Sequence, residues 1–162
     1  MRLASTLNRL SPIAPLLARV ILGILFIYHG VDKFDAGLDN VKNAFDGWGV
    51  PAPDVTAPAV AVFEIVGGVA LIVGLATRIV AALFTVQLIG ALLYVKQDLG
   101  VLSSEPMPGA ELDLAYLAGL VTLMLLGPGL LSIDERIGLE PRVTLSSTPH
   151  AGEVTTTRPV ES

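Results

Sequence analysis

The chain has 162 residues, of which 52% are hydrophobic and 15% charged, well below the charged fraction of about 25% that is typical of soluble domains. Its formal net charge of −5 argues against nucleic acid as a partner, because phosphate binding needs clustered lysine and arginine. The absence of cysteine excludes disulfides, thiolate metal sites, cysteine-ligated iron–sulfur clusters and dithiol redox chemistry within the chain.

Four separated apolar runs account for most of the hydrophobic residues. Each approaches the length of about 17 to 25 residues that an α-helix needs to cross a membrane. The runs are Ile13–Val31, Ala57–Leu75, Ile79–Val95 and Leu112–Leu131. The sequence therefore predicts an all-α, polytopic protein whose residues 13–140 form a bundle of four transmembrane helices.

The first run follows basic residues, as a signal peptide does, but no small-x-small cleavage site follows it, so we expect it to be retained. Most of the basic residues lie toward one side of the four predicted spans. The other three, Lys33, Lys42 and Lys96, lie in the loops on the opposite, outward side. The positive-inside rule then places both termini in the cytoplasm, in a multi-pass protein of the inner cell membrane. Residues 1–12 form the predicted cytoplasmic N-terminal segment.

Two segments outside the spans have a distinctive composition. In the first outward loop, Trp48 precedes Pro51 and Pro53, and we interpret it as an anchor at headgroup depth rather than a ligand contact. Residues 141–162 are rich in Ser, Thr and Pro with few large apolar side chains, which predicts a disordered cytoplasmic tail.

Each predicted span has one stripe of polar or small residues at helical spacing, as a bundle with a partly polar interior requires. The first stripe holds Arg19, Gly23, Phe26, Gly30 and Lys33, with His29 at its margin; the second holds Glu64, Gly67, Gly68, Leu71, Leu75 and Arg78. On the third and fourth runs the stripes are Gln87, Gly90, Ala91 and Tyr94, and Asp113, Tyr116, Leu120, Met124 and Gly127.

Glu64 is the one ionisable residue inside the second run. A lone ionised carboxylate at that depth would cost several kcal/mol, so it must be paired or protonated. His29 is closest to it in predicted depth, whereas Arg19 has the longer reach and a permanent charge. The pair could be a clamp that fixes helix register, or a site for a proton, a quinone or another ligand. Haem held by two histidines is excluded, because the only other histidine is His150 in the tail.

Several motifs occur in an order that resembles the DoxX family of small four-helix bacterial membrane proteins. They are Arg19, "GVDKF", "WGVPAP", "FEIVGGVALIVGLATR" and "LLGPGLLSID", and they cover residues 18–134. The most specific piece is Glu64 followed by Gly67, Gly68, Leu71, Gly74, Thr77 and Arg78. The resemblance implies a relation to subunits of archaeal terminal quinol oxidase and thiosulfate:quinone oxidoreductase systems, to mycobacterial membrane redox complexes and to accessory subunits of respiratory assemblies.

Three functions follow as hypotheses. The first is an accessory, non-catalytic subunit of a membrane respiratory or redox complex, with membrane lipids and the other subunits as partners. The second is a quinone-linked oxidoreductase subunit in which Glu64 exchanges protons, and the third is a small proton-coupled transporter. We assign no catalytic residue, no metal site and no cofactor, although a quinone is compatible with the second hypothesis.

Two sets of residues are expected to matter most. The predicted interior polar network comprises Arg19, His29, Lys33, Glu64 and Arg78. The glycines predicted to serve helix packing are Gly23, Gly30, Gly67, Gly68 and Gly74.

Overall fold

The structure is a computed structural model that describes residues 13–96, 101–102 and 109–139. The predicted N-terminal segment (1–12) and the predicted tail (141–162) lie outside the described residues. All regular structure in the described part is helical, as the sequence predicted. The helices are α2 (Ile13–Asp35), α3 (Leu38–Gly47), α4 (Pro53–Val73), α5 (Thr77–Tyr94), α6 (Glu111–Leu126) and α7 (Ile133–Ile137).

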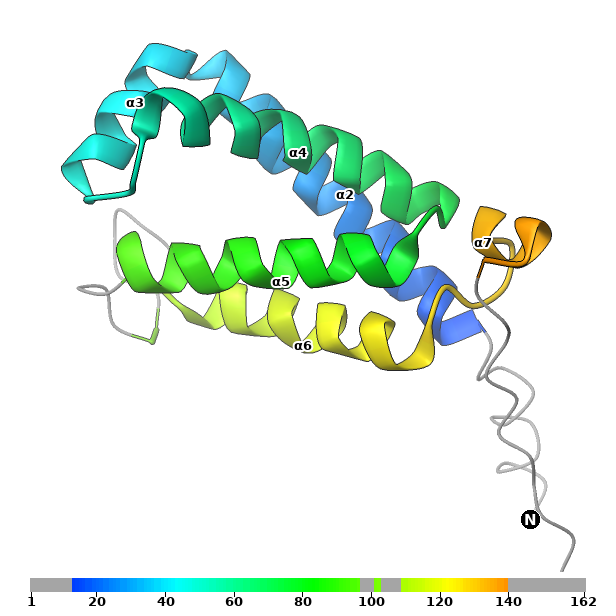
Figure 1. Cartoon of the computed structure of the whole chain (residues 1–162). Coiled ribbons are helices and arrows are strands. Elements are labelled where there is room, and N and C mark those ends of the chain that lie inside the picture. Colours follow the sequence, from blue (N-terminus) through cyan, green and yellow to red (C-terminus); the bar gives the residue numbers. More distant parts are fainter. Residues whose placement is uncertain (1–12, 97–100, 103–108, 140–162) are drawn as a thin grey trace, which may run out of the picture.

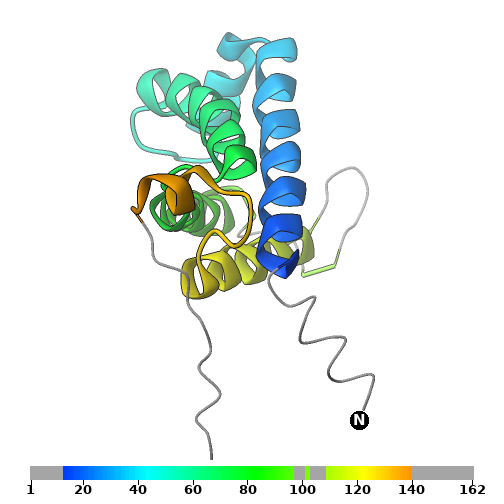
Figure 2. The same ribbon diagram turned by 90° about the vertical axis from the view of Figure 1, so that its right-hand side faces the viewer.

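Four long helices pack in two pairs, with α2 along α4 and α5 along α6 (Figure 1). Further contacts of α4 with α5 and of α2 with α6 join the pairs. The pairs approach each other at the end where α7 lies, and α7 covers the start of α5 (Figure 2). They diverge toward the opposite end, which α3 flanks (Figure 1). We call these the α7 end and the α3 end.

Among the described residues, α2, α4 and α5 are long and apolar enough to cross a membrane, so the chain is a multi-pass membrane protein. The fourth predicted run was Leu112–Leu131, but α6 has 16 residues and ends at Leu126. Its end is set by Gly127, which has a φ of 80°, and by Pro128, which has no N–H to continue the helical hydrogen bonds.

Two of the helices, α3 and α7, were not expected from the sequence. The first is an amphipathic helix with no buried residue, so it lacks the apolar run that reveals a span. The second has only five residues, and its start is capped by the Ser132 hydroxyl, which accepts a hydrogen bond from the Glu135 N–H.

The contact between α2 and α4 depends on glycines that face each other. A Cβ added to Gly23 would lie 2.6 Å from the carbonyl oxygen of Gly68, and a Cβ added to Gly68 would lie 2.6 Å from that of Gly23. Gly30 has the same relation to Ala61, whose carbonyl oxygen would be 2.8 Å away. The two backbones therefore approach more closely than any larger residue would allow, as is usual where membrane helices pack tightly.

An aromatic cluster joins the two helix pairs midway along the bundle. Phe26 of α2 stacks on Phe84 of α5 with ring centroids 3.7 Å apart, and Phe63 of α4 lies 4.5 Å from Phe84. Phe26 and Phe84 are buried together with Leu71, Leu120 and Leu123. The core therefore occupies the middle of the bundle and separates the α7 end from the α3 end.

We predict that Gly68→Val destabilises the protein. The new side chain would collide with the Gly23 carbonyl and the Ile27 side chain, and overpacking of this kind costs about 1–3 kcal/mol. Thermal unfolding in one detergent should show a lower Tm for this variant. Gly47→Ala is the control, because a Cβ at Gly47 meets no atom within 4 Å. Equal Tm values for Gly68→Val and the wild type would contradict the glycine contact.

Candidate functional site

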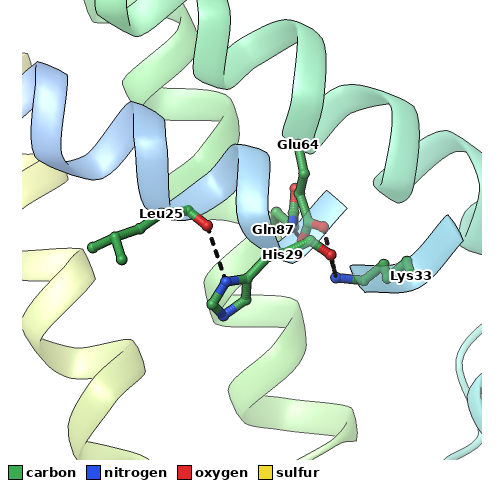
Figure 3. Close-up of polar contacts among 5 residues, drawn as sticks. All are labelled: Leu25, His29, Lys33, Glu64 and Gln87. Carbon is green, nitrogen blue, oxygen red and sulfur yellow. Dashed lines mark hydrogen bonds and ion pairs between the residues drawn. The ribbon is translucent and has the colours of Figure 1, made fainter. Parts of the chain in front are cut away.

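Glu64 is held by side chains from two other helices. Its side chain lies in α4 and is 4% exposed, Lys33 of α2 places Nζ 2.6 Å from Oε2, and Gln87 of α5 donates Nε2–H to Oε1 at 2.6 Å (Figure 3). Each carboxylate oxygen thus has a strong donor, which is the condition for keeping a charge in an apolar interior. We call these three residues the Glu64 triad.

His29 extends the polar wall beside the triad. Lys33 Nζ also donates to the His29 carbonyl oxygen at 3.3 Å, and His29 Nδ1 lies 3.0 Å from the carbonyl oxygen of Leu25 (Figure 3). A carbonyl can only accept, so Nδ1 must carry the hydrogen of this bond. In the neutral form of the ring, this tautomer leaves Nε2 as an acceptor. The ring of Tyr116 packs against the imidazole, with centroids 5.9 Å apart.

A cavity of about 680 Å³ lies at the α3 end, and the Glu64 triad forms part of its wall. Its volume is within the range of about 300–1,000 Å³ that small-molecule sites occupy. Most of the lining is apolar or aromatic, including Phe26, Phe45, Trp48, Phe63, Leu83, Val86, Leu88 and Tyr94. Phe45 of α3 and the following Trp48 close one side, so Trp48, expected only as an interfacial anchor, also faces this cavity.

A second polar group on the wall comes from α6 and the end of α5. Asp113 and Tyr116 of α6 line the cavity, as does Lys96, which follows α5. The described residues contain no cluster of three or more histidine, aspartate and glutamate side chains that could hold a metal ion. The cavity has a mostly apolar lining with a few polar groups, which is the usual composition of a small-molecule site.

The structure does not bring the predicted polar network together in one place. Lys33 and Glu64 form an ion pair with His29 beside it, but Arg19 lies 14 residues before Lys33 on α2, about 21 Å along the helix. The buried Arg19 donates Nη2–H to the carbonyl oxygens of Leu130 at 2.9 Å and Leu131 at 2.6 Å. Neither expected partner, Arg19 or His29, thus contacts the Glu64 carboxylate in the structure.

Asp134 organises the α7 end instead. Its carboxylate accepts hydrogen bonds from Ala76 N–H at 2.6 Å, from Thr77 N–H at 2.8 Å and from the Thr77 hydroxyl at 2.9 Å. Its own N–H donates to the Gly74 carbonyl at 3.0 Å. Arg78 lies in the first turn of α5 at this same end, so the carboxylate caps the helix that carries Arg78.

The predicted packing glycines are distributed between these regions. Gly23, Gly30 and Gly68 lie in the α2–α4 contact, and Gly67 faces Phe84. Gly74 follows α4 with a φ of 71°, and its Cα lies against the Arg19 guanidinium, so a side chain there would displace that group.

Sequence reasoning missed Gln87 as a partner of Glu64, although it placed Gln87 on the polar stripe of its helix. It also missed Asp134 as a helix cap. The signal for Gln87 was present, since a polar residue within an apolar run usually faces another polar group inside the bundle. No periodic pattern could show that Asp134 folds back onto residues 76 and 77.

We predict that Lys33→Met is more destabilising than the neutral pair Lys33→Met with Glu64→Gln. The single variant leaves a buried carboxylate without its cation, a loss of about 3–5 kcal/mol for fully buried pairs, and the 20% exposure of Lys33 places it at the lower end. Tm in detergent measures both. Lys42→Met is the control, because the exposed Lys42–Asp39 pair should contribute less than about 1 kcal/mol. Equal losses in the single and double variants would contradict a charged triad.

Two known proteins are similar in sequence to most of this chain. A protein of Bacillus subtilis (strain 168) named "Putative oxidoreductase CatD" is 39% identical over 128 residues, which cover 79% of this chain and 90% of that protein. The uncharacterized membrane protein Rv3486 of Mycobacterium tuberculosis (strain ATCC 25618 / H37Rv) is 33% identical over 127 residues, which cover 74% of this chain and 78% of that protein. No solved structure matches. Residues 14–97, more than half of the chain, match the DoxX family model, and the chain therefore belongs to the DoxX family.

Proposed function

We propose that this protein is a quinone-linked subunit of a membrane redox system. A lipid-soluble quinone or quinol would occupy the cavity beside Glu64, and a partner protein would carry the electron-transferring group. The observation that carries the proposal is the mostly apolar cavity of about 680 Å³ with a buried ion pair on its wall. A pair that served only to fix helix register would need no open space beside it.

The cavity chemistry supports a ligand with a flat, apolar body and a few polar atoms. Aromatic side chains from α2, α3 and α4 contribute Phe26, Phe45 and Phe63 to the lining. Polar groups are confined to a few positions, among them Glu64 and Gln87. Apolar walls hold the ring and its hydrocarbon substituents, while a few polar side chains fix the orientation of the oxygen atoms.

Interconversion of a quinone and its quinol moves two electrons and two protons. The chain has no cysteine, so its own sulfur cannot carry the electrons, and the proposal assigns their transfer to the redox group of a partner protein. Glu64 is placed to take up or release a proton at the cavity wall, and Lys33 compensates its charge when the proton is absent.

The proposal corresponds to the second hypothesis from the sequence, a quinone-linked subunit in which Glu64 exchanges protons. A relative named as an oxidoreductase favours a redox system as the setting. We further propose the inner cell membrane as the location, with both termini in the cytoplasm and with α6 as the fourth crossing helix. The α3 end and its cavity would then face the outer half of the membrane.

The test is isolation of the full chain from its native membranes in a mild detergent, followed by quantification of bound quinone plus quinol. We expect about one molecule per chain, together with a co-purifying redox protein identified by mass spectrometry. Gly90→Leu should abolish ligand retention, because a Cβ at Gly90 meets no atom within 4 Å and the longer side chain would grow into the cavity. Its fold should persist, since leucine favours helix more than glycine by about 0.5–1 kcal/mol.

Gly47→Leu is the matched control, because Gly47 is equally open but does not line the cavity. It should retain quinone as the wild type does. A wild-type chain that co-purifies with redox subunits but holds no quinone would contradict quinone binding. It would favour the purely accessory, non-catalytic role instead. Equal quinone in both leucine variants would contradict this cavity as its site.

A further inference from the structure

The cavity is open to the surface of the bundle between α4 and α5. On α5, Leu83 and Val86 line the cavity and are 50% and 68% exposed. On α4, the exposed Ala59 lines it together with Val60 and Phe63. Side chains that face both a cavity and the exterior form the rim of an opening. We call the opening bordered by these five residues the α4–α5 mouth.

The arrangement of the two helices accounts for the mouth. Residues 74–76 join α4 to α5 at the α7 end, and the helices separate toward the α3 end (Figure 1). They are still in contact at Phe63 and Phe84, whose ring centroids lie 4.5 Å apart. Farther along α5, Gly90 lines the cavity, and a Cβ there would meet no atom within 4 Å. The space next to the mouth is therefore free at this point.

The mouth lies near the middle of two helices that are long and apolar enough to cross a membrane. Phe63 is close to the centre of α4 (Pro53–Val73), and Val86 is close to the centre of α5 (Thr77–Tyr94). The centre of a membrane span lies within the hydrocarbon layer, which is about 30 Å thick. An opening at this depth meets lipid chains rather than water.

Polarity changes from the mouth to the interior on both helices. Phe63 and Val86 are each followed by a polar residue, Glu64 and Gln87, and these two are bonded to each other at 2.6 Å. The Glu64 side chain is 4% exposed, whereas Val86 is 68% exposed. A ligand that matches this arrangement has its oxygen-bearing part inside the cavity and a purely hydrocarbon part at the mouth.

The other exposed residues of the described cavity wall offer a hydrocarbon chain no comparable exit. They are His29, Tyr94 and Leu112. His29 and Tyr94 carry polar groups, and Tyr94 and Leu112 lie where α5 ends and α6 begins. A chain that left the cavity beside these residues would meet a polar side chain or the ends of the spans. Only the α4–α5 mouth combines an apolar rim with a position at hydrocarbon depth.

We infer that the ligand is a quinone or quinol with a long hydrocarbon tail, which passes through the α4–α5 mouth into the lipid. The ring occupies the cavity, while the tail beyond the mouth remains in an apolar environment. The length of the tail is then not limited by the cavity volume of about 680 Å³. The inference rests on the proposed function, because it assumes that a quinone ring enters the cavity.

The experiment compares two probes that share one ring. Menadione has no tail, and the second probe is a menaquinone in which the same ring carries a tetraprenyl tail. Trp48 is the only tryptophan of the chain and lines the cavity, so quenching of its fluorescence by the quinone ring reports binding. The measurement uses the purified full chain in detergent. Tryptophan octyl ester in the same micelles gives the quenching by dissolved probe, which is subtracted.

Two variants narrow the mouth, Val86→Phe from the α5 side and Ala59→Phe from the α4 side. Each should weaken binding of the tailed probe about tenfold, because the larger side chain collides with a tail that passes through. Menadione should stay within about twofold of the wild type. Val66→Phe is the matched control, since Val66 is 61% exposed on α4 but does not line the cavity. This control should bind both probes as the wild type does.

A loss confined to the tailed probe in both mouth variants supports the inference. Equal weakening of both probes, as a loosened fold would give, overturns it, and so does binding of the tailed probe that neither mouth variant changes. A wild type that binds menadione but not the tailed probe also overturns the route of the tail. In these three cases the quinone-linked function stands. Failure of both probes to quench Trp48 in the wild type overturns the inference together with the proposed function.

Discussion

The carboxylate of Glu64 constrains the arrangement of three helices. An ionised group cannot remain inside an apolar bundle without donors, and here one oxygen takes its donor from α2 and the other from α5. A shift of either helix by one residue along its axis, about 1.5 Å, would break a contact of 2.6 Å. Glu64 therefore fixes the relative depth of α2, α4 and α5 as well as forming part of the cavity wall.

The two ends of the bundle have different packing, and this difference creates the cavity. Toward the α7 end, Arg19 and Asp134 bind backbone groups of the segments that follow α6 and α4, and they tie these segments together. In the middle, the glycine contact of α2 with α4 and the stacked Phe26 and Phe84 fill the interior. Toward the α3 end, where the helix pairs diverge (Figure 1), α5 carries Gly90 and Ala91 on the cavity wall.

Hydropathy was sufficient to predict the long apolar helices but not α3, α7 or every side-chain partner. The long apolar runs gave α2, α4 and α5, because crossing hydrocarbon imposes a minimum length. Lys33 was expected in the interior polar network, but only Arg19 and His29 were considered as partners of Glu64. The flexible side chain of Lys33 lies back along α2 and reaches the carboxylate. Long basic side chains can thus keep their aliphatic part against apolar groups while the charged end reaches a polar partner.

The contacts of Arg19 lay beyond sequence reasoning for another reason. Its acceptors are carbonyls of Leu130 and Leu131, which are 111 and 112 residues away and belong to an irregular segment. Periodicity identifies the face of a helix but not the loop that folds over its end. Likewise α3, whose residues are mixed polar and apolar, gave no hydropathy signal, although it supplies Phe45 to the cavity.

The balance of charge on the cavity wall indicates what kind of molecule can bind. The lining contains two cations, Lys33 and Lys96, and two carboxylates, Glu64 and Asp113, so its formal charges cancel. A wall without net charge gives no Coulomb attraction to an anionic substrate, such as a phosphate or a carboxylic acid, that would offset removing its charge from water. An uncharged ring loses far less on entering an apolar cavity, and its few oxygen atoms can use the polar positions. The same buried pair that sets the helix depths thus favours a neutral, lipid-soluble ligand.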